Sequence, residues 1–192
     1  MLNEQHHRQL QMIASYLPSI RFDWTKEQMV HTFSVLAELL DYRMMWEKEE
    51  GVCFCNHLDG YPRILLEKNQ GQIQSVWLDI DTYRDMDELL KDRKSGDRIN
   101  ELTMERLRSL DVVVRFLSAS WGAPFFYGEF WDPHFPRDQY VSIRMALWKV
   151  PDAHIAVQVE HQDREYPISL NMLITPEQEL SSHRFDALMK RR

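Results

Sequence analysis

Residues 141–160 read VSIRMALWKVPDAHIAVQVE. Apolar side chains recur at every second position on both sides of Pro151-Asp152; they are Val141, Ile143, Met145 and Leu147, then Ile155, Val157 and Val159. A period of two is typical of a β-strand with one buried face, and a Pro-Asp pair favours a turn. A third run repeats the pattern after a polar turn at 162–165, with Ile168, Leu170, Met172 and Ile174. We therefore predict a three-strand antiparallel meander with one buried side.

A second group of three strands is predicted at 52–58, 61–67 and 72–80, because Asp59-Gly60 and the segment 69–71 are hairpin signals. Helical spacing predicts helices at 3–17, 25–46, 85–91, and from 97 to about 121. The second helix would begin at a capping box, Thr25–Gln28, and would end with Met44, Met45 and Trp46 in the core.

A short C-terminal helix is predicted to begin at Thr175–Gln178, with Phe185 and Leu188 as its contacts. The expected fold is therefore α+β, with antiparallel sheet or sheets from two three-strand meanders. The N-terminal, central and short C-terminal helices would pack against them. No linker interrupts residues 1–192, so we expect one domain.

Composition narrows the class of partner. Hydrophobic residues make up 44% of the 192 residues and charged residues 28%, which is typical of a folded globular chain. A net charge of −7 argues against nucleic-acid binding and favours a basic protein partner. The only basic cluster, Lys190–Arg192, is interpreted as a solvated tail.

The expected location is the cytoplasm. Residues 1–17 lack the basic and apolar regions of a secretory signal, and no apolar run is long enough to cross a membrane. The only two cysteines, Cys53 and Cys55, are one residue apart and are not expected to form a disulfide.

Cys53, Cys55, His57 and Asp59 are the residues most suggestive of a metal site, because thiolate and imidazole bind zinc. Their spacing argues against one. Alternate residues of a strand lie about 6.6–7 Å apart, too far for four ligands of one ion. We expect a core role for the cysteines and no cofactor.

Asp79 and Asp81 end a predicted strand, where two carboxylates can hold Mg²⁺ if a third acid or a histidine joins them. Glu160 or His161 could complete such a site only if the fold brings them near. A polar hairpin end contains His154, Asp163 and Glu165, and a solvated turn is its ordinary explanation. No P-loop, GxGxxG, HExxH or GxSxG motif is present.

The segment 121–135, WGAPFFYGEFWDPHF, is the candidate binding site because seven of its fifteen residues are aromatic. Its glycines and prolines exclude a regular helix or a long strand. Trp121, Phe125 and Phe130 could plug the second strand group, while exposed rings beside carboxylates are typical of interfaces. The predicted partner-binding residues are Phe126, Tyr127, Glu129, Phe130, Trp131, Asp132 and His134.

The function predicted from these features is that of a non-enzymatic binding protein. In size, acidity and lack of a reaction motif, the chain is similar to small acidic inhibitors and immunity proteins that bacteria use against toxins. Occlusion of a basic toxin or effector is the predicted mechanism. The alternatives are a metal-dependent hydrolase using Asp79 and Asp81 with a histidine, a secretion chaperone, and a small-ligand binder.

Overall fold

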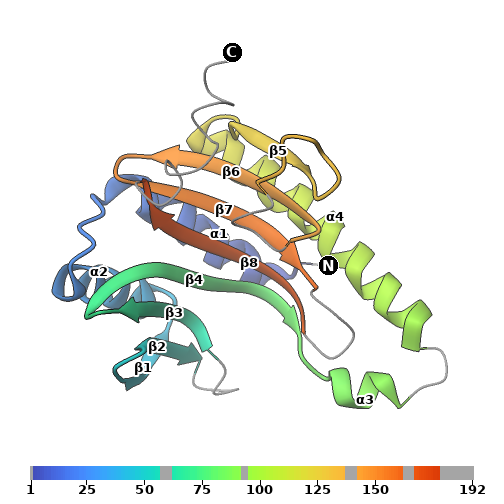
Figure 1. Cartoon of the computed structure of the whole chain (residues 1–192), viewed down its shortest axis with the longest axis horizontal. Coiled ribbons are helices and arrows are strands. Elements are labelled where there is room, and N and C mark those ends of the chain that lie inside the picture. Colours follow the sequence, from blue (N-terminus) through green and yellow to red (C-terminus); the bar gives the residue numbers. More distant parts are fainter. Residues whose placement is uncertain (1, 57–61, 92–94, 137–141, 162–166, 178–192) are drawn as a thin grey trace.

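One sheet of eight antiparallel strands forms the frame of the protein in a computed structural model (Figure 1). The structure describes residues 2–56, 62–91, 95–136, 142–161 and 167–177. The strands lie in the order β1-β2-β3-β4-β8-β7-β6-β5. Contact between β4 and β8 joins an early and a late group of strands into one sheet. The α+β prediction is confirmed, with one sheet in place of two separate meanders.

The helical elements are α1 (Glu4–Tyr16), the 3₁₀ turn η1 (Leu17–Ser19), α2 (Lys26–Leu39), α3 (Met86–Leu90) and α4 (Ser95–Trp121). The strands are β1 (Tyr42–Glu47), β2 (Gly51–Asn56), β3 (Pro62–Asn69), β4 (Gln72–Tyr83), β5 (Phe126–Glu129), β6 (Arg144–Val150), β7 (Ala153–Glu160) and β8 (Ile168–Pro176).

The first helix begins where the sequence predicts. Asn3 is its N-cap, and the Asn3 side chain accepts a hydrogen bond from the His6 amide at 3.0 Å. Thr25 is the N-cap of α2, but the predicted capping box is wrong. The Thr25 side chain makes no capping hydrogen bond, and the Thr25 amide donates to the Asp23 carboxylate at 3.1 Å.

The end of α2 is the largest error of the sequence prediction. The helix ends at Leu39 instead of about residue 46, and Asp41 reverses the chain with a φ of 58°. The next residues form β1, a fourth strand in the early group. Met44 and Met45 are exposed on this strand and do not fill the core.

The helices α1, α2 and α4 cover one face of the sheet and enclose the main core (Figure 1). Strand register aligns a row of buried side chains across this face; its members are Ile64, Leu78, Met172, Val157 and Ala146. Phe33 and Leu36 of α2, with Leu110 of α4, are fully buried against it. A stack of this kind holds the sheet by removing apolar area from water.

The opposite face carries a second apolar row, so the prediction of one buried side is wrong. Seven buried or partly buried side chains align across it, namely Cys53, Leu65, Trp77, Leu173, Ala156, Leu147 and Phe126. Polar side chains lie next to some of these residues on the same face; Gln158 is two positions after Ala156, and Asn171 is two positions before Leu173. The sequence pattern is therefore that of a strand with one solvated face, although Ala156 on this face is fully buried.

The two ends of the late strand group also differ from expectation. The aromatic segment supplies β5, a strand of four residues at one edge of the sheet. Thr175 and Pro176 end β8 instead of belonging to a helix, and Glu177 directly after them is helical. The predicted C-terminal helix with Phe185 and Leu188 lies outside the described residues, as does Val141 of the first meander strand.

Candidate protein-binding surface at the β5 edge

Residues 125–136, which we call the aromatic arm, are held to β6 by backbone hydrogen bonds. The Phe125 amide donates to the Leu147 carbonyl at 2.9 Å and the Phe130 amide donates to the Ile143 carbonyl at 2.8 Å. Between these bonds, β5 pairs in register with β6, from Phe126 opposite Leu147 to Glu129 opposite Arg144. The arm is therefore fixed to β6 from Phe125 to Phe130.

A tight turn follows β5 and is built around Asp132. The Asp132 amide donates to the Glu129 carbonyl at 2.8 Å, and the Phe135 amide donates to the Asp132 carbonyl at 3.0 Å. The Asp132 carboxylate accepts from the His134 amide at 2.8 Å. Aspartate commonly stabilises turns in this way. Asp132, predicted to contact a partner, thus has a local role in shaping the arm.

The inner side of the arm forms a second hydrophobic core. The Phe135 ring is only 5% exposed and lies 5.9 Å from the Phe126 ring and 5.6 Å from the Phe130 ring, centroid to centroid. These rings pack on Met145, Leu147, Ala156 and Leu173, with Phe125 and Trp77 at the margin. Phe126 and Phe130 are partly buried, so the predicted role of Phe125 and Phe130 as plugs agrees with their positions.

Gly128 allows this packing. A Cβ atom at this position would lie 2.7 Å from the Phe126 ring and 3.1 Å from the Asp132 carboxylate. Because glycine has no side chain, a neighbouring ring can pack directly on the strand backbone at that position. The spacing Phe126-Tyr127-Gly128 thus lets the phenylalanine lie back over its own strand.

The outer side of the arm presents the rings that remain. Trp131 is 79% exposed, the most exposed large hydrophobic side chain among the described residues, and Tyr127 is 45% exposed. The Trp131 and Phe130 rings form a T-shaped pair at a centroid distance of 5.2 Å, and most of the Trp131 surface is open. Glu129 and His134 are exposed beside it.

Two carboxylates, Asp111 and Glu129, lie beside Tyr127 on the outer side of the arm. Arg144 lies between them, donating to Asp111 at 3.2 Å and to Glu129 in a shorter contact. The Tyr127 hydroxyl donates to Asp111. Burial and the Asp111 carboxylate raise the Tyr127 pKa, which keeps the phenol protonated and donating. Asp111 and Glu129 outnumber the one guanidinium that pairs with both, so this corner of the molecule keeps a net negative charge.

Trp121, the remaining aromatic residue of the predicted segment, belongs to the main core instead. Its indole N–H donates to the Ala14 carbonyl of α1 at 2.9 Å, and its ring meets Trp148 edge-on at 5.6 Å. The sequence did not single out Asp111 or Arg144, because α4 and β6 supply them from distant positions. No local signal identifies that pairing.

The carboxylates proposed for a hydrolase are paired with arginines. Asp79 accepts from Arg63 at 2.8 Å and from Arg84 at 2.5 Å. Asp81 pairs with Arg106 of α4 at 3.2 Å. The strand register shifts between the two aspartates. His6 of α1 lies near them: burial lowers the His6 pKa, while the Asp81 and Asp79 carboxylates act to raise it. Within the part of the chain that the structure describes, no three potential ligands converge on a metal site.

Glu160 and Cys53, the other possible metal ligands, are buried and make structural contacts. Glu160 accepts from the buried amides of Gln158 and Asn171, both at 2.9 Å, and burial raises its pKa. Burial raises the Cys53 pKa to about 11, so its thiol stays protonated and is a poor metal ligand. His57, Asp59, Asp163 and Glu165 lie outside the described residues.

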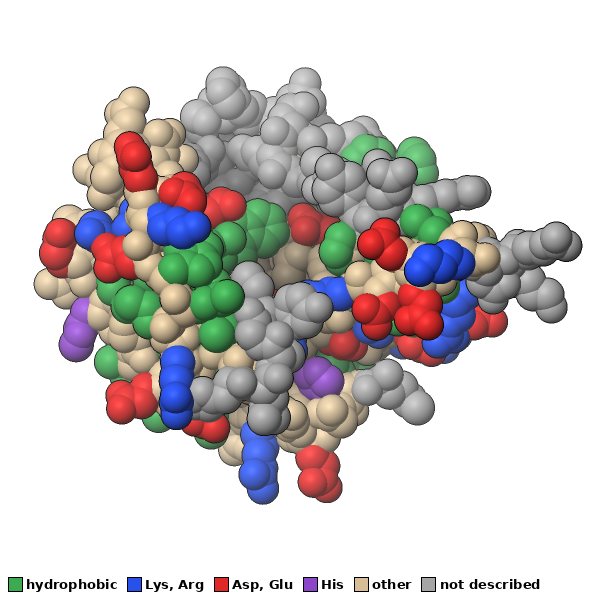
Figure 2. Space-filling view, turned by 90° about the horizontal axis from the view of Figure 1, so that it is seen from below, with side chains coloured by type: hydrophobic (Ala, Val, Ile, Leu, Met, Phe, Trp, Pro, Cys, Tyr) green, Lys and Arg blue, Asp and Glu red, His purple; other side chains and the backbone are tan. Residues whose placement is uncertain are grey.

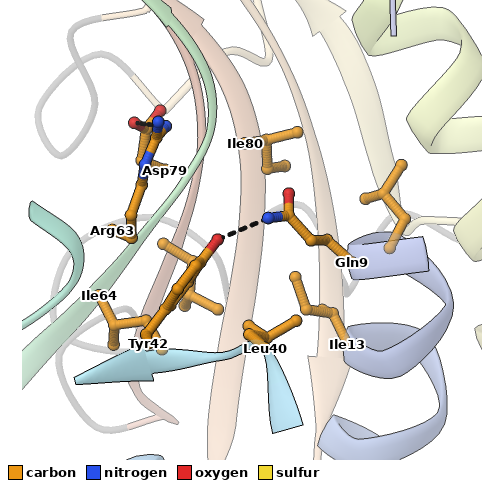
Figure 3. A pocket seen from close by; sticks show the side chains of 10 residues that line it. Gln9, Ile13, Leu40, Tyr42, Arg63, Ile64, Asp79 and Ile80 are labelled. Carbon is orange, nitrogen blue, oxygen red and sulfur yellow. Dashed lines mark hydrogen bonds and ion pairs between the residues drawn. The ribbon is translucent and has the colours of Figure 1, made fainter. Parts of the chain in front are cut away.

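A small pocket lies beneath α1, between the end of α2 and strands β1, β3 and β4 (Figure 3). The Gln9 amide donates to the Tyr42 hydroxyl across it at 2.7 Å, while Leu10, Ile13, Leu40, Ile64, Leu78 and Ile80 supply apolar walls. Its volume of about 10 Å³ accommodates a single water molecule and no substrate. Figure 3 shows the Arg63–Asp79 pair lying to one side of it.

Comparison with known proteins adds no relative. No protein-family model, curated protein or solved structure matches the chain. None of the helices in the described ranges has both the length and the apolar character needed to cross a membrane.

Proposed function

We propose that the protein is a protein-binding module and that the outer side of the aromatic arm docks a basic partner. The observation that carries the proposal is Trp131. A tryptophan that is 79% exposed stands on a backbone fixed by hydrogen bonds at both ends of β5. Single exposed aliphatic side chains are common on protein surfaces, but tryptophan is enriched among the residues that dominate binding energy.

Rigidity of the arm supports this role. Phe126, Phe130 and Phe135 anchor the arm from inside, so little conformational entropy would be lost when a partner covers Trp131. Asp111 and Glu129 pair with Arg144 beside the arm and outnumber it, and Asp132 lies in the turn next to Trp131, so the net charge here is negative and would steer a basic surface toward the arm. Neutralisation of a basic toxin or effector by occlusion is the specific form of this proposal.

Trp131→Ala tests the proposal directly. Wild-type and variant proteins are immobilised, the proteins captured from native lysate are compared quantitatively, and affinity for the captured partner is measured with purified components. We expect binding at least about ten-fold weaker for the variant, because loss of a central aromatic anchor costs about 2 kcal/mol. The melting temperature should change little, since the ring is mostly exposed.

Met104→Ala is the matched control, because Met104 is an exposed hydrophobic side chain on α4 away from the arm. It should leave the affinity unchanged. A large fall in the melting temperature of Trp131→Ala with unchanged affinity would show that the ring serves stability and would reject the docking role.

A further inference from the structure

The first turn of α1 is closed by a histidine at a position where glutamate or glutamine is usual. Asn3 is the N-cap, and His6 is the third residue of the helix. The His6 amide donates to the Asn3 side-chain oxygen at 3.0 Å, and the Asn3 amide donates back to the ring nitrogen Nδ1 of His6 at 3.1 Å. This reciprocal pair is a capping box, in which the third residue must offer an acceptor to the amide of the N-cap.

The charge state of the His6 imidazole decides whether the second of these hydrogen bonds can form. Nδ1 accepts a hydrogen bond only in the neutral ring, with the proton on the other nitrogen, Nε2. In the protonated ring both nitrogens are donors, so the Asn3 amide faces an N–H group and loses its acceptor. The positive end of the α1 dipole lies at the same place and also disfavours an imidazolium. The capping box therefore requires a neutral His6.

His7, the next residue, contacts the same N-cap in a way that does not depend on its charge. The ring nitrogen Nδ1 of His7 lies 2.8 Å from the Asn3 backbone oxygen. A carbonyl oxygen only accepts, so this nitrogen carries a proton and donates. A protonated imidazole still donates from Nδ1, and the contact therefore persists in both charge states. Of the two neighbouring histidines, only His6 makes a contact that protonation removes.

The charged groups around His6 do not favour a positive charge on its ring. Four of them act on it, namely Asp81 and Asp79 of β4, Arg63 of β3 and Arg106 of α4. Each aspartate is already paired with an arginine, Asp81 with Arg106 at 3.2 Å and Asp79 with Arg63 at 2.8 Å. Acidic and basic side chains are likewise interspersed on the face of the molecule shown in Figure 2. Burial has the largest effect on His6 and lowers its pKa, so folding favours the neutral ring.

We propose that His6 is a pH-sensitive switch that closes and opens the first turn of α1. With a neutral ring, the capping box closes the turn, and Leu2 just before it packs against the main core. Protonation removes the hydrogen bond from the Asn3 amide to His6, so the turn opens and Leu2 loses its fixed position. The ratio of closed to open turn is greatest above the ordinary imidazole pKa of about 6.5, and it falls as the pH drops below that value. It levels off below the lowered pKa of the closed turn.

An NMR titration of the purified full chain tests the proposal. At about pH 7.5, where imidazoles are neutral, long-range proton–nitrogen correlation spectra should show His6 with its proton on Nε2 and His7 with its proton on Nδ1. As the pH is lowered to about 5, the Cα chemical shifts of residues 4–7 should move toward unfolded values along the His6 titration curve. Loss of the cap should reduce the ratio of closed to open turn about five-fold.

His6→Gln is the decisive variant, because a glutamine at this position accepts from the N-cap amide at every pH. Its Cα shifts over residues 4–7 should remain helical throughout the titration. His7→Gln is the matched control, since it removes a neighbouring imidazole that contacts the same N-cap, and its first turn should respond to pH as in wild type. Every variant retains His154, so the effect of His154 on global stability is common to all of them. Circular dichroism confirms that each variant is folded.

Three results would overturn the proposal: a His6 ring that carries its proton on Nδ1 at neutral pH, Cα shifts of residues 4–7 that do not follow the His6 titration, or a His6→Gln variant that responds to pH like wild type. A response lost in His7→Gln and kept in His6→Gln would assign the switch to His7 and reject the role of His6. None of these measurements involves Trp131, so their outcome does not affect the proposed role of the aromatic arm.

Discussion

The two edges of the sheet are finished in different ways. At the β5 edge, the chain folds its own aromatic arm over the sheet and builds a second core around Phe135. At the β1 edge, a bulge at Met45 interrupts the strand and the apolar side chains stay outside. One edge is thus stabilised within the molecule, while the other is protected from extension but left apolar.

Polar contacts reinforce the difference. At the β5 edge, Arg144 ties together Asp111 of α4 and Glu129 of the arm. At the β1 edge, Glu47 pairs with Lys26 of α2 at 2.6 Å and with Lys68 of β3 at 3.3 Å. Each group of ion pairs thus connects an edge of the sheet to a helix, α4 at the β5 edge and α2 at the β1 edge. At the β5 edge, aromatic rings also build a second buried cluster around Phe135, so we expect stability to depend more strongly on this cluster than on the exposed side chains of β1.

Phe135→Ala should have the largest effect on stability. Removing a ring that is 5% exposed and touches Phe126 and Phe130 should lower the free energy of unfolding by about 4 kcal/mol. Met45→Ala at the other edge should cost less than about 0.5 kcal/mol when measured in dilute protein. Urea unfolding curves give both values. Equal losses at the two positions would contradict the idea that the cluster around Phe135 stabilises the fold more than the exposed side chains of β1 do.

Lowering the pH should reduce the free energy of unfolding through His154, which lies near the arm. His154 is buried in contact with the Phe125 ring, and burial, aided by Lys149, lowers its pKa to about 4. The folded state therefore resists protonation more than the unfolded state does, whose histidine pKa is about 6.5. The stabilising contribution is complete above pH 6.5 and is lost as the pH falls toward 4, by about 3 kcal/mol. Unfolding free energies measured across this range should show the decline, and His154→Gln should flatten it.

The Glu160 carboxyl has the opposite effect on the pH dependence of stability, so its contribution has to be measured separately from that of His154. Burial raises the pKa of this carboxyl, so folding gains as the pH falls through the raised value toward 4.5. The His154 decline should therefore become steeper in a Glu160→Gln background. A curve that is unchanged by His154→Gln would show that this imidazole is not the group responsible.

Alanine substitutions at Gly51 and Gly128 should have smaller effects on stability, and they test how far the early and the late strand groups can adapt to an added Cβ. A Cβ at Gly51 would lie 2.5 Å from the Leu66 carbonyl oxygen, whereas at Gly128 the nearest atom is the tip of the Phe126 ring. Backbone cannot move aside as a ring can. We therefore expect Gly51→Ala to cost about 2 kcal/mol and Gly128→Ala about 1 kcal/mol. Thermal unfolding of the two variants measures the difference, and a larger loss at Gly128 would mean that the arm is the less adaptable region.

Local patterns in the sequence predicted most of the secondary structure. Asn3 and Pro18 bounded the first helix, and alternation at 141–147, 155–159 and 168–174 identified three strands. These signals are local, because capping and side-chain alternation depend on neighbouring residues. The continuation of an apolar stripe past Leu40 predicted helix where β1 forms, since YRMMWE satisfies both periods and only pairing with β2 selects the strand.

The sequence by itself determined that the chain is acidic, lacks a reaction motif and concentrates aromatic residues at 121–135. Tertiary structure alone decided which of those rings are buried. Pairing of β5 with β6 turns Phe126 inward and leaves Trp131 at the tip of the turn, while α4 brings Asp111 to Arg144. It also decided that β4 lies beside β8 and that Met45 bulges from an open edge. These outcomes depend on contacts between residues far apart in the chain, which side-chain periodicity does not encode.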